Sequence, residues 1–255
     1  MPYRTTSGLD LPGDSSLIWR YLDFWKFEAL IQQRGLFFVR SDRFSDPWDS
    51  ALPPKWIAKM QEYMCDRDNG GSYTEAEWYE EREIPTNPIQ CWNCDHDENE
   101  RMWNEYTTDN CSLVIRSSVG RFKRCFESTG FDVRIGLINY GYHDELDDPK
   151  FAFGYWGDNH PILVNPWYVP RFLKQTRFAH ENELRATIHV GQQYQPIDTG
   201  YNLEIGNDGI NTLIESIRLH PSSNRELYDR VDSLLNSNGL EATVEQSVIP
   251  RKTDE

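Results

Sequence analysis

The segment from residue 178 to residue 190 alternates between polar and apolar side chains, and this alternation constrains the fold strongly. In an extended strand, side chains two positions apart share a face. One face of the predicted strand is mostly apolar and holds Leu184, Ala186, Ile188 and Val190, and the other face holds Glu181, Glu183, Arg185, Thr187 and His189. The chain must therefore contain a sheet whose core lies on one side of this strand. Two carboxylates and a guanidinium lie on the other side.

Two interpretations of the polar face are open. Antiparallel sheets often have one solvated face, so the charges can be ordinary surface residues. Alternatively, Glu181 and Glu183 form a carboxylate pair in a cleft. A Glu-x-Glu pattern is short and common, so spacing alone favours the solvated face.

Composition limits the class of protein. The chain has 255 residues, 38% of them hydrophobic, and a formal net charge of −15. A chain this acidic repels phosphate backbones, so a broad nucleic-acid-binding surface is not expected. No stretch of about 18 apolar residues occurs, and residues 1–14 contain no apolar run, which predicts a cytoplasmic protein without a membrane span or signal peptide.

A short run of metal-ligand residue types begins within the predicted strand at residues 89–92. Cys91, Cys94 and His96 are spaced like half of a zinc site. A structural zinc site needs a second pair at a similar short spacing, and Cys111 and Cys125 are too far apart to supply it. No metal site is therefore predicted, and the thiols are expected to be reduced.

Strands and helices alternate irregularly along the first half of the chain. The pattern predicts a strand at 17–22, a helix that Asp23 caps and Gly35 ends, and a strand at 36–39. A turn-rich loop with Asp46 and Asp49 follows, and turn chemistry accounts for both carboxylates. Residues 53–86 read as a helical insertion.

The second half continues in the same way. The pattern predicts a strand at 89–92, a helix that Asp97 caps and that contains Met102 and Trp103, and a strand at 111–116 with a helix after it. An extended segment at 133–142, an irregular loop at 143–160 and a short helix at 168–175 are expected next. A strand-helix-strand extension at about 203–250, with a capping box at Ser223 and Glu226, ends the series. Hairpin-like neighbours favour an α+β fold over a doubly wound parallel sheet. We expect a single domain over residues 1–255.

Several segments together resemble the domain of unknown function 2971 family of bacteria and archaea. They are WRYL at 19–22, LFF at 36–38 with FSDP at 44–47, CW at 91–92 with MWNEY at 102–106, FAHENELR at 178–185, SIRLHP at 216–221 and VEQS at 244–247. They cover nearly the whole chain in the family's order. The family name implies no activity.

The layout also resembles, more distantly, the ADP-ribosyltransferase superfamily. Those proteins place an Arg or His on the first strand, then a helix and a second strand, and a catalytic Glu at the head of a late strand. Arg20 and Glu183 hold the matching positions here. The chain departs from the pattern on the middle strand, where Cys91, Trp92 and Asn93 replace Ser-Thr-Ser. The resemblance implies an ADP-ribosyltransferase-like core of mixed and antiparallel sheets with a helical insertion.

The resemblance implies NAD as the substrate. Cleavage of its nicotinamide–ribose bond passes through an oxocarbenium-like ribose, which a carboxylate stabilises. Glu183 is the candidate for that role, and Glu181 is the candidate for orienting or deprotonating an acceptor. The predicted NAD-binding residues are Arg20, which suits pyrophosphate, and Tyr21, Trp92, Asn93, Trp103 and Arg185.

Functions of other classes are open at this point. A metal-dependent phosphodiesterase or nuclease could use Glu181, Glu183 and loop aspartates, and would lose activity with a chelator. A non-catalytic sensor or partner-binding module would expose aromatic residues as a patch. The acceptor of an ADP-ribosyl group could be protein, nucleic acid or water. The family resemblance suggests phage defence as a setting.

Overall fold

A computed structural model describes residues 3–4, 9–51, 84–141, 153–156, 160–163, 169–191 and 198–250. Residues 3–4, 153–156, 160–163 and 169 are described by their backbone alone. The helical insertion expected at 53–86 lies outside the described residues, apart from the single turn α4 (Ile84–Thr86). Among the described helices, none combines the length and apolar character that a bilayer crossing requires.

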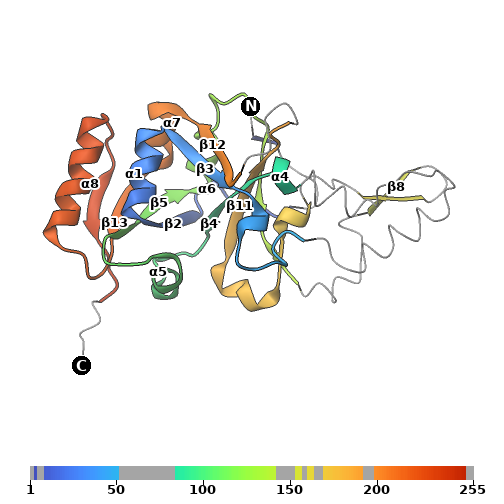
Figure 1. Cartoon of the computed structure of the whole chain (residues 1–255), viewed down its shortest axis with the longest axis horizontal. Coiled ribbons are helices and arrows are strands. Elements are labelled where there is room, and N and C mark those ends of the chain that lie inside the picture. Colours follow the sequence, from blue (N-terminus) through green and yellow to red (C-terminus); the bar gives the residue numbers. More distant parts are fainter. Residues whose placement is uncertain are drawn as a thin grey trace.

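A mixed, largely antiparallel sheet forms the centre of the protein (Figure 1). Its strands, in the order in which they pair, are β1 (Tyr3–Arg4), β6 (Val133–Leu137), β11 (Glu183–Ile188), β4 (Ile89–Asn93), β2 (Leu17–Asp23), β5 (Ser112–Ser118), β13 (Ser216–Leu219) and β14 (Thr243–Gln246). Off this path, β3 (Gly35–Val39) pairs with β4 and with β12 (Gly200–Glu204). The predicted α+β class is confirmed.

Helices cover the sheet (Figure 1), and two two-stranded sheets are not hydrogen-bonded into it. The helices are α1 (Phe24–Gln32), α5 (Glu100–Tyr106), α6 (Val119–Arg124), α7 (Gly206–Leu213) and α8 (Arg225–Ser237), with 3-10 turns η1 (Ser41–Arg43), η4 (Val169–Phe172) and η5 (Thr176–Glu181). The small sheets pair β7 (Asn139–Tyr140) with β10 (Leu173–Lys174), and β8 (Phe153–Trp156) with β9 (His160–Leu163). The β8–β9 hairpin corrects the irregular loop expected at 143–160, because its aromatic run suits a strand.

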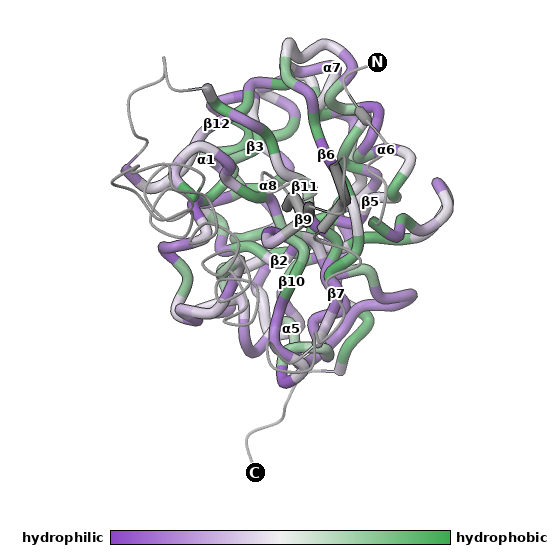
Figure 2. Tube along the Cα trace, turned by 90° about the vertical axis from the view of Figure 1, so that its right-hand side faces the viewer, coloured by the Kyte–Doolittle hydropathy of each residue, from purple (hydrophilic) through white to green (hydrophobic). Residues whose placement is uncertain are grey.

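Two buried clusters pack against the sheet. The larger one joins the apolar face of β11, including Leu184 and Ala186, to Trp92 and to α1, α6, α7 and α8. The smaller one contains Trp19, Tyr21, Met102, Trp103 and Val114. Figure 2 shows hydrophobic residues, in green, along several central strands, including β2 and β5. The core therefore lies on the side of β11 that the alternation predicts.

The predicted helix ends are partly wrong, each for a local reason. Asp23 precedes α1 but makes no capping bond, because its carboxylate accepts from Thr108 N at 2.9 Å. Arg34 takes the left-handed conformation (φ 50°) that was expected of Gly35. Gly35 is required instead by close packing, since a Cβ there would lie 2.7 Å from the carbonyl oxygen of Leu203.

Two other predicted caps are displaced to asparagines. The side chain of Asn99, rather than Asp97, accepts from the backbone of Arg101 and caps α5. Asn224, rather than Ser223, accepts from Leu227 N at 3.1 Å and caps α8. Asn, Asp and Ser are nearly equal as caps, so composition alone does not choose between neighbours.

Candidate functional site

The central sheet divides between β2 and β4. These strands share a single residue pair, Trp19 with Asn93, whereas β2 pairs with β5 along its whole length. Arg20, the next residue of β2, turns its Nη1 to the carbonyl oxygen of Cys91 on β4. The Arg20 guanidinium thus takes the place of a backbone hydrogen bond at the point where the two strands separate.

Arg20 and Glu183 act on each other across β4. Asn93 pairs with Trp19 on one side and with Glu183 on the other, so the three residues form one row across the sheet. Burial lowers the pKa of Arg20, and the charge of Glu183 is among the groups that oppose this effect. Residues 20 and 183, which are far apart in the sequence, are therefore close enough to interact electrostatically.

Five charged side chains form an ionic cluster: Asp49, Lys174, Glu181, Glu183 and Arg185. Each side chain is 9% exposed or less. Arg185 binds two carboxylates at once. Its Nε and Nη2 lie 2.6 and 3.0 Å from Glu183, and its Nη1 and Nη2 each lie 2.7 Å from Asp49. Lys174 Nζ contacts Glu181 and lies 3.2 Å from Glu183 Oε2.

Glu183 is held as a fixed anion. Burial raises the pKa of its carboxyl, but the charges of Arg185 and Lys174 outweigh burial and lower that pKa to about 2. Its backbone N–H donates to the Tyr140 hydroxyl at 2.8 Å. The thiol of Cys91 also donates to the carboxylate. Glu183 is therefore ionised at neutral pH, and its contacts fix both carboxylate oxygens.

Glu181 does not lie on the strand, which corrects the sequence prediction. It ends η5, and Asn182 takes a left-handed conformation (φ 39°) before β11 begins at Glu183. The buried Asn93 amide donates to the Glu181 carbonyl oxygen at 2.7 Å and holds this corner. The two carboxylates meet through Lys174 rather than through strand periodicity.

The two glutamates have opposite protonation tendencies. Burial raises the pKa of Glu181, Lys174 opposes this, and the nearby Glu183 charge adds to it. Glu181 also accepts a hydrogen bond from Tyr106. A pair of carboxyls whose environments separate their pKa values suits one fixed anion and one proton-exchanging group. The roles that the superfamily resemblance implies for Glu183 and Glu181 stay predictions.

The predicted aromatic contacts to NAD lie in the core. Trp92 is 1% exposed and packs on Phe122 with ring centroids 5.3 Å apart. Tyr21 and Trp103 meet edge to face at 5.1 Å, and the Tyr21 hydroxyl accepts from Asn99 N. Stacking of these rings on a ligand stays a prediction, and their packing supports a role behind the site instead.

Sequence reasoning missed three groups at the site. Sequence patterns explain Asp49 by turn chemistry and place Lys174 in a short helix. They give Tyr106 no role at the site. Asp49 and Lys174 are 5% and 7% exposed and belong to the ionic cluster, and Tyr106 bonds to Glu181. A signal was present for Lys174, because it directly follows the apolar pair Phe172 and Leu173, where a solvated lysine is not expected.

Among the described residues, the metal-ligand side chains that lie close together are not Cys91, Cys94 and His96. Cys91 and Cys94 are free thiols, and His96 is 93% exposed beside Asp97. In the described part of the chain, Glu105, His180 and Glu181 place one ligand atom each within 4.8 Å of one another.

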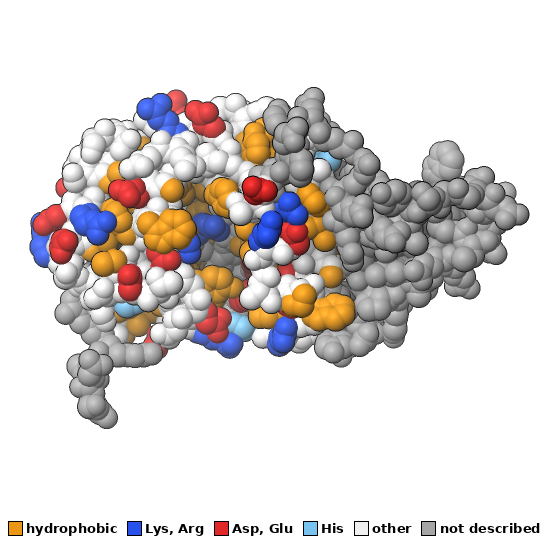
Figure 3. Space-filling view, viewed as in Figure 1, with side chains coloured by type: hydrophobic (Ala, Val, Ile, Leu, Met, Phe, Trp, Pro, Cys, Tyr) orange, Lys and Arg blue, Asp and Glu red, His pale blue; other side chains and the backbone are white. Residues whose placement is uncertain are grey.

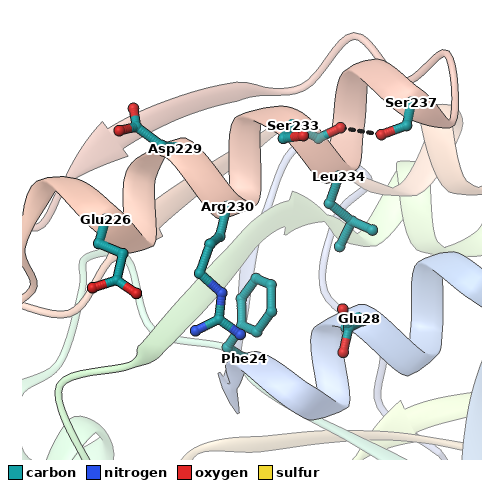
Figure 4. A pocket seen from close by; sticks show the side chains of 8 residues that line it. All are labelled: Phe24, Glu28, Glu226, Asp229, Arg230, Ser233, Leu234 and Ser237. Atoms are coloured by element: carbon teal, nitrogen blue, oxygen red, sulfur yellow. Dashed lines mark hydrogen bonds between the residues drawn. The ribbon is translucent and has the colours of Figure 1, made fainter.

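One face of the molecule is hollowed. Figure 3 shows a recess over the region of β4 and β11, between the side that carries α1 and α8 and the side that carries η5. A separate pocket of about 670 Å³ lies between α1 and α8, where Arg230 stacks on Phe24 at 4.1 Å (Figure 4). None of the predicted site residues lines that pocket.

Comparisons with known proteins give few matches. No protein-family model and no curated protein matches the sequence. Among solved structures, DarT from Thermus sp. 2.9 in complex with carba-NAD+ is similar over 94% of this chain and 98% of that chain, with 11% identity and a TM-score of 0.37. DarT with NAD+ matches at 10% identity over 92% and 97% of the two chains, with a TM-score of 0.38. DarT with ADP-ribosylated ssDNA matches at 8% identity over 96% and 98%, with a TM-score of 0.38. Identities and TM-scores this low assign no residue of this chain a role.

Proposed function

We propose that this chain cleaves the nicotinamide–ribose bond of NAD and transfers ADP-ribose to an acceptor. The observation that carries the proposal is the position of Arg20 and Glu183. Although they are far apart in the sequence, the Arg20 guanidinium and the fixed, ionised Glu183 carboxylate lie close together near the point where β2 and β4 separate.

Glu183 supplies the electrostatic part of catalysis. The ribose gains positive charge as the bond to nicotinamide breaks, and a carboxylate held in place stabilises that charge more than it stabilises the ground state. Arg185 and Lys174 fix the Glu183 oxygens, so no reorganisation is needed during the reaction. Arg185 is therefore reassigned, in this proposal, from NAD contact to positioning of Glu183.

Arg20 supplies the anion-binding part. Its planar guanidinium can bind two phosphate oxygens of the pyrophosphate. One nitrogen already donates to Cys91, which fixes the orientation of the group. Asn93 holds the backbone of Glu181, while Tyr21, Trp92 and Trp103 support the strands from behind.

The acceptor and the setting are the least constrained parts of the proposal. Glu181 is the group we assign to the acceptor side. The free thiols at Cys91, Cys94, Cys111 and Cys125 suit the cytoplasm, where we place the activity. We propose phage defence as its setting, on the family resemblance alone, and a plaque assay with and without Glu183→Gln tests this part separately.

The direct test uses NAD labelled in the adenylate phosphate. The purified chain is incubated with this NAD and single-stranded DNA, double-stranded DNA, a protein extract, or buffer alone. Nicotinamide release and label transfer are measured together. We expect release in at least one arm and its loss in Glu183→Gln. No release in any arm refutes the proposal.

A metal-dependent phosphodiesterase is the second candidate, and the grouping of Glu105, His180 and Glu181 favours it. It predicts cleavage of a phosphodiester that requires a divalent ion and stops with chelator. A chelator arm in the same assay separates the two functions. A partner-binding module, favoured by the pairing of the cluster carboxylates with Lys174 and Arg185, predicts no turnover in any arm.

A further inference from the structure

His180 and Glu105 form a hydrogen-bonded pair at the outer edge of the ionic cluster. The Nε2 of His180, on η5, lies 2.9 Å from Glu105 Oε2, on α5. The Nδ1 of His180 lies 3.1 Å from the carbonyl oxygen of Arg177. A carbonyl oxygen only accepts, so Nδ1 carries a proton in this geometry.

The other side chain of this pair, Glu105, is a carboxylate with a lowered pKa. Burial raises the pKa of Glu105, but hydrogen bonds from Arg101 and His180 outweigh burial and lower it. Glu105 is thus an ionised acceptor, and Nε2 must donate to it. The hydrogen bond of the pair thus lies between two side chains that reach solvent.

The pair lies next to Glu181. One ligand atom each of Glu105, His180 and Glu181 falls within 4.8 Å of the others, which is a separation that one water molecule can bridge. Exposure rises along the series. The side chain of Glu181 is 6% exposed, that of His180 is 19% exposed and that of Glu105 is 36% exposed. The three side chains therefore lead from the buried cluster to solvent.

The other groups that contact Glu181 hold their protons. Burial raises the pKa of the Tyr106 hydroxyl, and the charges of Glu181 and Glu183 raise it further, so Tyr106 stays a donor. Burial lowers the pKa of Lys174, but the surrounding carboxylates outweigh burial and raise it. Among the described neighbours of Glu181, the His180–Glu105 pair is thus the one suited to exchange a proton.

We infer that His180 and Glu105 relay to solvent the proton that Glu181 takes from the acceptor. The inference rests on the proposed function. The acceptor oxygen or nitrogen attacks C1′ of the ribose, and the bond from C1′ to nicotinamide breaks with its electron pair going to the nicotinamide nitrogen. The acceptor proton passes to Glu181. His180 gives its Nε2 proton to solvent through Glu105 and takes the proton from Glu181.

His180 acts through Glu181 in this account, so it is a positioning residue rather than a catalytic one. His180→Ala and Glu105→Gln should lower the maximal rate of nicotinamide release about tenfold or more. They should leave the affinity for NAD unchanged. Added imidazole should restore the rate of His180→Ala, because His180 reaches solvent. A merely structural role would not respond to imidazole.

His96→Ala is the matched control, because His96 forms a similar surface pair with Asp97 at 3.0 Å. It should have the wild-type rate, with or without imidazole. Equal rates for wild type and His180→Ala overturn the relay and leave the proposed function intact. Loss of wild-type activity in chelator, with recovery on adding Mn²⁺, overturns the relay in favour of a metal site. No nicotinamide release by wild type refutes the proposed function, and the relay with it.

Discussion

Replacing Glu183 by Gln tests how strongly the ionic cluster depends on this one charge. The pKa of Glu183 falls from 4.5 to about 2 on folding, because Arg185 and Lys174 outweigh its burial. At about 1.4 kcal/mol for each pH unit, this shift corresponds to roughly 3 kcal/mol of stability at neutral pH. The Gln side chain has nearly the same shape without the charge. We therefore expect Glu183→Gln to lower the free energy of unfolding by roughly 3 kcal/mol.

The pH dependence follows from the direction of the shift. A lowered pKa in the folded state gives stability that is complete above pH 4.5 and is lost as the pH falls through about 2. The difference between wild type and Glu183→Gln should therefore be constant from pH 7 to about pH 5 and should be roughly halved near pH 3. Urea unfolding followed by circular dichroism, at several pH values, measures this difference.

Glu127→Gln provides the control. Glu127 is exposed, follows α6 and is not a member of the cluster. Its replacement should change the free energy of unfolding by less than about 0.5 kcal/mol. A Glu183→Gln variant as stable as Glu127→Gln, or a stability difference independent of pH, would refute the view that Glu183 is held as a buried anion.

Three further predictions concern the same framework. Arg185→Met should lower the free energy of unfolding by about 3–5 kcal/mol, because it leaves Glu183 and Asp49 buried without their shared cation. In a double-mutant cycle measured by denaturation, Arg185→Met combined with Asp49→Asn should lose less stability than the sum of the two single variants. Glu98→Gln should lower the free energy of unfolding by about 2 kcal/mol and speed hydrogen exchange at the Val248 amide. The reason is that the buried Glu98 carboxylate accepts hydrogen bonds from Trp103, Arg218 and the Val248 N–H. Unchanged exchange at Val248 would contradict this prediction. Cys91 should react with iodoacetamide at pH 7.5 far more slowly than free cysteine, because burial and Glu183 raise the pKa of its thiol. Peptide mass spectrometry measures the two rates, and equal rates would contradict this prediction.

Local patterns account for the parts of the fold that sequence alone predicts. The alternation in β11 places Leu184 and Ala186 in the core and Glu183 and Arg185 on the opposite face, because strand geometry depends only on neighbouring residues. The same spacing places Arg185 beside Glu183, on the polar face that the alternation predicts. The order of strand, helix and strand around Arg20 was also predictable.

Contacts between distant segments account for what the sequence leaves open. Asp49 lies in a loop whose Pro and Asp residues fit a turn, and only the folded chain shows it paired with Arg185. The Glu-x-Glu spacing wrongly places Glu181 on the strand, because Asn182 reverses the backbone after η5. The Glu181 carboxylate joins the ionic cluster by contacting Lys174, and local sequence periodicity does not predict this contact.

The rate of nicotinamide release, measured against NAD concentration for wild type, Glu183→Gln and Arg20→Lys, tests the central claim most directly. The account predicts that Glu183→Gln loses at least about a hundredfold in maximal rate, as expected for loss of a fixed transition-state charge. It predicts that Arg20→Lys mainly raises the NAD concentration needed for half-maximal rate, because lysine keeps the charge and loses the two-point contact. Wild-type release that neither substitution changes would contradict a site shared by Arg20 and Glu183.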